Sequence, residues 1–258
     1  MSRDLAIRAL ILGGTTEAVQ LAQACAAIPE LEITTSLAGR TRAPAAPPGA
    51  VRVGGFGGVD GLGRYLRTQA IDRLVDATHP FARQIGRHAV QACRAAGVPR
   101  LRLLRPPWQR EPGDRWTEVE SLAEAARRLP QRARVFLSVG RSDLCAFAAL
   151  QHWFLVRTIE PAERCLAHAR WLAERGPFHL EDELALLRAH KVDVVVTKAS
   201  GGEATYAKLA AARQLGLPVI MVRRPPPPPG PVVDSVAAAL AWLVHHPADP
   251  GTLAGRST

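Results

Sequence analysis

Short apolar runs alternate along this chain with longer stretches in which apolar residues recur every three or four positions. The short runs predict strands at residues 5–12, 31–37, 50–53, 73–76, 100–104, 134–139, 153–159, 169–173, 192–197 and 219–222. The longer stretches predict helices at residues 16–27, 58–68, 81–96, 122–129, 143–150, 181–189, 206–215 and 235–244. Such alternation is typical of a parallel sheet that helices cover on both faces, so we predict an α/β fold.

The alternation is interrupted once, at residues 105–108 (Arg-Pro-Pro-Trp), and then begins again. Consecutive prolines end any regular element, and a chain of 258 residues is long enough for two domains. We therefore predict two Rossmann-like domains, residues 1–107 and 108–258, each with a parallel sheet flanked by helices, and an active-site crevice between them. The prolines at residues 225–229 are expected to form a stiff connector to the last helix.

The charge balance points to an anionic partner. The chain has 33 Lys+Arg against 23 Asp+Glu, a formal net charge of +10, and 47% of its residues are hydrophobic. The hydrophobic content excludes a disordered chain. The positive charge leaves nucleic acid, an anionic lipid surface, a phosphorylated cofactor and a polycarboxylate substrate open.

Several classes of protein are disfavoured by what the sequence lacks. The cysteines, Cys25, Cys93, Cys145 and Cys165, have no metal-ligand spacing, so no metal site is expected. No unbroken run of about 18 apolar residues predicts a membrane span. The N-terminal residues carry no small-residue cleavage site. We expect a cytoplasmic protein.

The first strand is followed at once by Gly13-Gly14-Thr15-Thr16-Glu17 and a helix. Glycines at such a turn let the backbone approach a phosphate, and the helix N-terminus behind them attracts negative charge. Thr15 and Thr16 add hydroxyl groups that can also cap the helix. The third glycine of the usual dinucleotide-binding string is missing, and a tight turn without a ligand is the alternative interpretation.

The second strand ends in Ala38-Gly39-Arg40-Thr41-Arg42. A domain that binds NAD usually has an acid there for the ribose hydroxyls, whereas arginine makes charge-assisted contacts with a 2′-phosphate. The sequence therefore favours NADPH over NADH, bound by the first domain, with the second contributing to substrate binding. The alternative is that these arginines are ordinary solvated cations.

Two further strand ends of the first domain attract attention. Residues 54–58 (Gly-Gly-Phe-Gly-Gly) close the third strand, where backbone packed against a flat ligand and a mobile loop explain the glycines about equally well. Thr78 and His79 follow the fourth strand. Because carboxyl ends of parallel strands form the binding crevice of α/β sheets, we expect both to face the cofactor. His79 is one candidate catalytic residue.

In the second half, polar and glycine-rich turns again follow predicted strands. Arg141, Arg175, Lys198, Ser200 and Gly201 could supply cations, hydroxyls and backbone donors to an anionic substrate. Lys198 directly follows an apolar strand in a chain with only three lysines, and it is the second candidate catalytic residue. A turn without a ligand is the alternative for the glycines.

Taken together, these strings resemble one family, the precorrin-6A reductases of cobalamin biosynthesis. The resemblance covers essentially the whole chain. It rests on Gly-Gly-Thr-Thr-Glu at residues 13–17, Ala-Gly-Arg-Thr at 38–41, Asp-Ala-Thr-His-Pro-Phe-Ala at 76–82, Arg-Gly-Pro-Phe at 175–178, Thr-Lys-Ala-Ser-Gly at 197–201, and the stretches 208–213 and 218–225. Ala199 departs from the acidic or amide residue that many relatives have after the lysine, and Ser138-Val139 replaces a more usual Thr-Thr.

The resemblance implies NADPH-dependent reduction of a ring-D carbon–carbon double bond of precorrin-6A to give precorrin-6B, on a substrate that carries cobalt in some relatives. We place the pyrophosphate on Gly13–Thr16, the 2′-phosphate on Arg40 with Thr41 or Arg42, and the nicotinamide near Thr78 and His79. Basic residues of the second half would hold the carboxylates of the tetrapyrrole. We expect no metal, a monomer or small homo-oligomer, and at most transient contact with neighbouring pathway enzymes.

Rival functions lack their own signatures. A short-chain dehydrogenase needs Tyr-x-x-x-Lys, and neither Tyr65 nor Tyr206 has a lysine four residues on. The arginines are scattered and not interleaved with aromatic residues, which disfavours a basic nucleic-acid-binding module. Another NADP-dependent Rossmann oxidoreductase with a polyanionic substrate remains the main alternative.

Overall fold

Two parallel sheets organise the chain, and each belongs to its own unit. The computed structural model describes residues 6–39, 47–160 and 165–245. Unit 1 contains the described residues up to Arg105 and those from Pro225 onward, whereas unit 2 contains those between Pro106 and Arg224.

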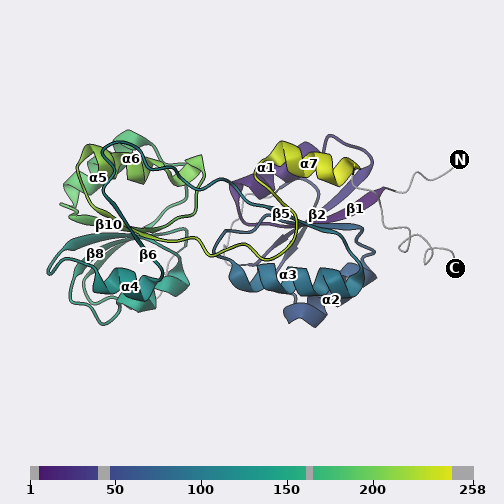
Figure 1. Cartoon of the computed structure of the whole chain (residues 1–258), viewed down its shortest axis with the longest axis horizontal. Coiled ribbons are helices and arrows are strands. Elements are labelled where there is room, and N and C mark those ends of the chain that lie inside the picture. The colour runs from purple at the N-terminus through teal and green to yellow at the C-terminus, as the bar shows by residue number, and fades with distance from the viewer. Residues whose placement is uncertain (1–5, 40–46, 161–164, 246–258) are drawn as a thin grey trace, which may run out of the picture. The chain divides into compact units, whose positions relative to one another are not determined.

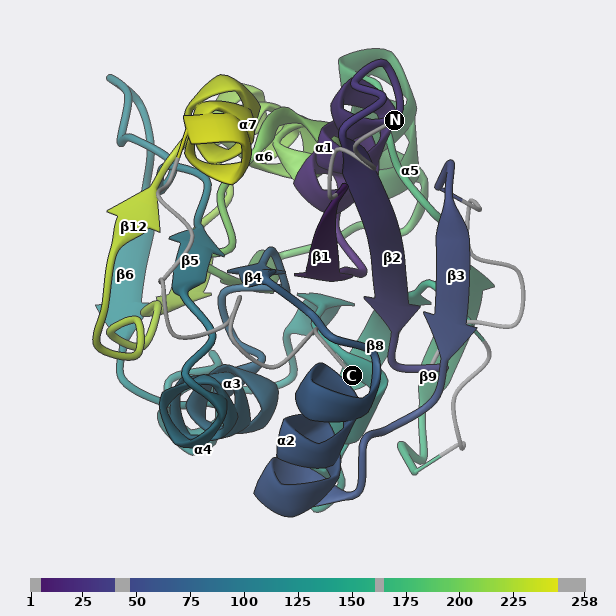
Figure 2. The same ribbon diagram turned by 90° about the vertical axis from the view of Figure 1, so that its right-hand side faces the viewer.

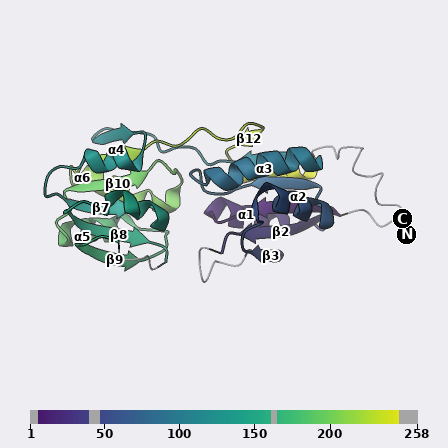
Figure 3. The same ribbon diagram turned by 90° about the horizontal axis from the view of Figure 1, so that it is seen from below.

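The sheet of unit 1 has six strands, all parallel, in the order β12-β5-β4-β1-β2-β3, which Figure 2 shows side by side. The strands are β1 (Ile7–Leu12), β2 (Leu31–Leu37), β3 (Ala50–Val53), β4 (Arg73–Asp76), β5 (Arg100–Leu103) and β12 (Val232–Val233). The helices are α1 (Thr16–Cys25), α2 (Gly58–Thr68), α3 (Arg83–Ala96) and α7 (Val236–His245). Helices α1 and α7 cover one face of the sheet, and α2 and α3 cover the other (Figures 1 and 3).

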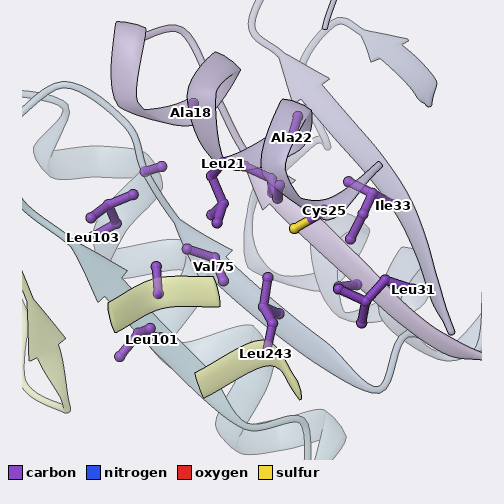
Figure 4. Packing of buried hydrophobic residues seen from close by; sticks show 14 residues of the cluster. Ala18, Leu21, Ala22, Cys25, Leu31, Ile33, Val75, Leu101, Leu103 and Leu243 are labelled. Carbon is purple, nitrogen blue, oxygen red and sulfur yellow. The ribbon is translucent and has the colours of Figure 1, made fainter. Parts of the chain in front are cut away.

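The central strand β1 shows why this sheet is buried on both faces. Its side chains alternate: Ala9 and Ile11 join the cluster under α1 and α7, and Leu10 and Leu12 join the cluster under α2 and α3. Figure 4 shows the first of these clusters, in which Leu21 of α1 and Leu243 of α7 come together over the sheet. Each large apolar side chain buried in this way stabilises the fold by about 1.5–3 kcal/mol.

Unit 2 repeats the layered plan. Its six-stranded parallel sheet has the order β6-β11-β10-β7-β8-β9. The strands are β6 (Trp116–Val119), β7 (Arg134–Ser138), β8 (Trp153–Thr158), β9 (Ala169–Ala173), β10 (Val194–Lys198) and β11 (Val219–Val222). The α-helices are α4 (Leu122–Arg127), α5 (Leu180–Ala189) and α6 (Ala207–Gln214), and the 3₁₀ helices are η1 (Arg141–Phe147) and η2 (Glu203–Thr205). Helices α5 and α6 lie on one face of this sheet and α4 on the other (Figure 1).

Each sheet has one edge strand, β6 or β12, that extends the five-stranded βα pattern common to both sheets. Strand β6 precedes the other five strands of unit 2, and β12 follows all of unit 2 but pairs with β5 in unit 1, where Val232 is level with Arg102. Helix α7 then packs against α1. The predicted second domain, residues 108–258, therefore differs from the structure, because after Arg224 the described chain returns to unit 1.

The predicted fold class, two parallel sheets flanked by helices, is confirmed. The sequence missed the edge strands β6 and β12, and the helix predicted at residues 143–150 is the 3₁₀ helix η1. Residues 225–229 are neither helix nor strand, as predicted. Among the helices of the described ranges, none has both the length and the apolar character that crossing a membrane requires.

Candidate active site

The strand order of unit 1 reverses between β1 and β4, and ligands of such sheets bind outside the strand ends at this switch point. Leu12 and Asp76, the last residues of the two strands, are level with each other. The turns that follow are joined directly, because the Thr15 hydroxyl donates a 2.8 Å hydrogen bond to the carbonyl of Ala77. The predicted phosphate turn and the predicted nicotinamide-side turn are thus neighbours.

The turn after β1 is an open glycine turn that leads into the N-terminus of α1. A Cβ at Gly13 would lie 3.0 Å from Cγ2 of Thr35, so a side chain here would have to push Thr35 aside. Gly14 has φ +105°, which favours glycine, and no atom lies within 4 Å of the place where its Cβ would be. Thr15 caps α1 by accepting a 3.2 Å hydrogen bond from the N–H of Ala18. An open turn at a helix N-terminus fits a pyrophosphate.

The other members of the predicted cofactor set are placed as follows. Glu17 forms a 2.8 Å ion pair with Arg105, which follows β5. Gly39, two residues after β2, has φ +71°. Arg40 and Thr41 lie outside the described residues.

Arg52, in β3, shapes the glycine-rich turn at residues 54–58, and sequence reasoning missed it. Its guanidinium donates to the carbonyls of Gly54 at 2.6 Å and Gly55 at 2.7 Å. It also stacks 3.9 Å from the ring centroid of Phe56. Several contacts of one arginine therefore hold the turn.

A buried ionic cluster supports the turn after β4. Asp76 is fully buried and pairs with Arg102, and Arg100 Nη1 lies 3.9 Å from its other oxygen. The Thr78 hydroxyl donates to Asp76 Oδ1 at 2.7 Å and accepts from Arg102 Nη1 at 2.9 Å. Thr78 thus uses its side chain to hold the turn in place, although it also lines a small recess beside Thr15.

Sequence reasoning quoted Asp76 only as part of a motif and gave Arg100 and Arg102 no role. Their signal was present: charged residues within short strands that are otherwise apolar. Such residues are rarely buried unless they are paired. The sequence could therefore have predicted an ion pair between Asp76 and an arginine of residues 100–104, because both predicted strands are buried.

His79 is half-buried at the same turn. Its Nδ1 accepts a 3.3 Å hydrogen bond from the N–H of Phe81. In the neutral imidazole this acceptor role leaves the proton on Nε2. The ring is held by this bond and by the ring of Phe81, 5.8 Å away between centroids.

Unit 2 has an equivalent switch point between β7 and β10. Lys198 ends β10, and its ammonium group pairs with Asp143 of η1. The same carboxylate accepts a 3.0 Å hydrogen bond from the N–H of Gly140, which follows β7. The structure therefore joins Lys198 to the turn that carries Arg141, and Asp143 is the residue that sequence reasoning missed.

Side chains from other segments donate hydrogen bonds to the backbone carbonyls of the loop after Lys198. Arg224 donates to the carbonyls of Ala199 at 3.1 Å and Ser200 at 2.9 Å. Trp108 donates to the carbonyl of Gly202 at 2.8 Å. Gly201 has φ +70°, and an added Cβ would collide with the carbonyl of Pro106.

Arg175 follows β9 and is exposed. Its loop packs beside the Lys198 loop, because the N–H of Phe178 donates a 3.1 Å hydrogen bond to the carbonyl of Ala204. Unit 2 thus contains all five residues predicted for substrate binding, at or after the ends of β7, β9 and β10. Within the described part of the chain no group of His, Cys, Asp and Glu residues has the geometry of a metal site.

Comparison with known proteins decides the family. Residues 8–244 match the model of the family described as precorrin-6x reductase CbiJ/CobK. The chain belongs to this family. The family predicted from the sequence is confirmed, and with it the class of enzyme, an oxidoreductase.

Individual CbiJ/CobK relatives agree over nearly the whole chain. The chain is 52% identical over 240 residues to the precorrin-6A reductase of Rhodococcus erythropolis, covering 92% of this chain and 97% of that one. It is 30% identical over 236 residues to the cobalt-precorrin-6A reductase of Methanothermobacter thermautotrophicus, covering 84% and 76%. A solved structure of CobK precorrin-6A reductase superimposes with a TM-score of 0.89 at 45% identity, covering 95% and 98%.

Proposed function

We propose that this CbiJ/CobK protein is a precorrin-6A reductase of cobalamin biosynthesis. It reduces a ring-D carbon–carbon double bond with NADPH and forms precorrin-6B. The observation that carries the proposal is the 52% identity with a precorrin-6A reductase over 92% of the chain. Identity with the cobalt-precorrin relative is only 30%, and this contrast supports a substrate without cobalt.

Unit 1 binds NADPH in this proposal. The pyrophosphate lies on the turn Gly13-Gly14-Thr15-Thr16, where the open glycine turn and the N-terminus of α1 offer backbone donors and a favourable dipole. Arg40 holds the 2′-phosphate through charge-assisted hydrogen bonds, assisted by Thr41. NADPH, when bound, supplies the hydride.

The turn after β4 orients the nicotinamide end. Its backbone is fixed by the cluster of Asp76, Arg102 and Thr78, all of which are at most 9% exposed. A fixed turn places His79 at a constant position beside the reacting groups. Preorganisation of this kind lowers the barrier because little has to be reoriented during the reaction.

Unit 2 recognises the tetrapyrrole, which is edged with carboxylates. Arg141 and Arg175 are exposed cations on the loops that follow β7 and β9, and Lys198 presents an ammonium group that Asp143 orients. Ser200 and Gly201 belong to a loop whose carbonyls are already bound by Arg224 and Trp108. We also propose a cytoplasmic location and a monomer or small homo-oligomer.

The test is an anaerobic spectral assay with precorrin-6A, run with NADPH and with NADH. The proposal expects conversion with NADPH at a much higher kcat/KM than with NADH. Arg40→Ala is expected to weaken NADPH by about tenfold or more and NADH little, because one charge-assisted contact is worth about 1.5–3 kcal/mol. Equal losses for both nucleotides would refute the 2′-phosphate assignment. No conversion with either nucleotide would refute the function.

A further inference from the structure

A pocket of about 200 Å³ lies in unit 1 at the start of α3, and it shares Pro80 and Leu104 with the small recess beside Thr15. Arg83 and Arg87 of α3 line it, together with Arg102 of β5 and the proline run at residues 225–229. In Figure 3 the segment that leads to β12 runs past α3. None of the residues assigned above to the pyrophosphate, the 2′-phosphate or unit 2 belongs to this lining.

The proline wall is held in place by specific contacts. Arg100 donates a 2.7 Å hydrogen bond from Nη2 to the carbonyl of Pro229. Gly86 allows the prolines to approach α3, because a Cβ there would lie 3.1 Å from Cγ of Pro228. Proline rings have no N–H group to donate, so this wall is apolar and rigid.

The floor of the pocket carries surplus positive charge. Asp76 is the acid that pairs with both Arg100 and Arg102, and the side chains of the three are 0%, 6% and 4% exposed. One carboxylate facing two guanidinium groups leaves a surplus of one positive charge in the buried cluster. Within the described residues, Arg102 Nε also has no hydrogen-bond partner. An unbalanced buried charge is costly, and an anion beside it lowers that cost.

The rim of the pocket adds two more cations. Arg83 and Arg87 are four residues apart on α3, so they lie on one face of the helix. Both are exposed, the described residues offer them no ion-pair partner, and the lining contains no acid. The N-cap residue of α3, Ala82, makes no side-chain cap, so the positive end of the helix dipole adds to the same potential.

We propose that this pocket binds a carboxylate carried on a short aliphatic stem, namely an acid side chain at the edge of the tetrapyrrole. The stem packs on the proline rings while Arg83 and Arg87 bind the carboxylate. A phosphate would use the arginines but would gain nothing from the apolar wall, so the lining favours the carboxylate. This inference rests on the proposed function, because it takes its ligand from the same substrate.

The test compares Arg83→Gln and Arg87→Gln with the matched control Arg94→Gln. Arg94 is an exposed arginine in the last turn of the same helix and does not line the pocket. Binding of precorrin-6A without nucleotide is followed by quenching of intrinsic fluorescence, and NADPH binding is measured separately. We expect each pocket variant to raise the Kd for precorrin-6A about three- to tenfold, as expected for a solvent-screened charged contact. The control and NADPH binding remain unchanged.

Competition identifies the chemistry of the ligand. Precorrin-6A binding is titrated with sodium butyrate and with inorganic phosphate, and butyrate is expected to compete better in the wild type but equally poorly in both pocket variants. Stronger competition by phosphate, or a raised Kd for NADPH in the variants, would overturn the carboxylate assignment.

The two proposals fail in different ways. A wild-type protein that reduces precorrin-6A, with pocket variants that bind it as tightly as the wild type, would refute the pocket and leave the function standing. A wild-type protein that does not bind precorrin-6A would refute both.

Discussion

The fully buried carboxylate of Asp76 offers a quantitative test of the structure. Replacing it in Asp76→Asn removes the only acid that pairs with Arg100 and Arg102 among the described residues. The amide oxygen can still accept the hydrogen bond from Thr78, but two guanidinium groups are left without a counter-charge. Removing one partner of a buried ion pair costs about 3–5 kcal/mol.

The expected change in melting temperature follows from this loss. For proteins of this size each kcal/mol lowers the melting temperature by roughly 2–4 °C, so the variant should melt about 6–20 °C below the wild type. The effect belongs to unit 1. Of the five tryptophans only Trp242 lies in unit 1, so far-UV circular dichroism should show the shift more strongly than tryptophan fluorescence.

Two controls distinguish the loss of the buried ion pair of Asp76 from the general effect of removing a negative charge. Asp60→Asn makes the same chemical change on the exposed surface of α2 and should cost less than about 1 kcal/mol. The double variant Asp76→Asn/Arg102→Gln should lose less than the sum of the two single variants, because one partner no longer remains buried alone. A loss at Asp76 no larger than that at Asp60 would refute the stabilising role of the pair.

Three further outcomes are expected. Lys198→Gln should raise the apparent KM for the tetrapyrrole and leave the Kd of NADPH unchanged, whereas the exposed Lys191→Gln should change neither; weaker NADPH binding in the first variant would show that Lys198 does not serve the substrate. Burial raises the pKa of Cys25 to about 11 and that of Cys93 to about 12, so both thiols should react with Ellman's reagent at about pH 8 only after unfolding; labelling of either one in the folded protein would contradict this. Burial also raises the pKa of the Glu183 carboxyl above its ordinary value of 4.5, so the folded protein binds the carboxyl proton more tightly than the unfolded chain does. The stability that this group contributes therefore falls as the pH rises above about 4.5. Glu183→Gln should flatten the fall of the melting temperature as the pH rises above about 4.5, and an unchanged slope would refute the assignment.

The sequence predicted most elements because a buried parallel sheet needs continuous apolar strands. It missed β6 and β12 for a physical reason. Strand β6 lies at a sheet edge with both central residues exposed, and β12 has only two residues, so neither carries the pattern of a buried strand. The helix predicted at residues 143–150 is the 3₁₀ helix η1, in which Asp143 accepts a hydrogen bond from the N–H of the N-cap residue Gly140, as in a capping box. Apolar spacing along a segment this short does not separate a 3₁₀ helix from an α-helix.

The sequence likewise identified only some residues of the candidate site. Gly13 and Gly14 directly follow β1 and Lys198 ends β10; they were identified because strand ends meet at one edge of a sheet. Asp143 and Arg52 were not identified. Their roles depend on which turn each side chain reaches, and spacing along the chain carries no information about that distance.

By itself the sequence determined the α/β class, the family and the candidate turns at the strand ends, because these depend on local periodicity and on residues adjacent in the chain. Only the tertiary structure decided that α7 and β12 return to unit 1 and that Arg100 and Arg102 close around Asp76. It also decided that the prolines at residues 225–229 form the wall of a cationic pocket. Each of these joins segments far apart in the sequence, and such pairing is selected by the burial of apolar surface and of charge in the folded chain.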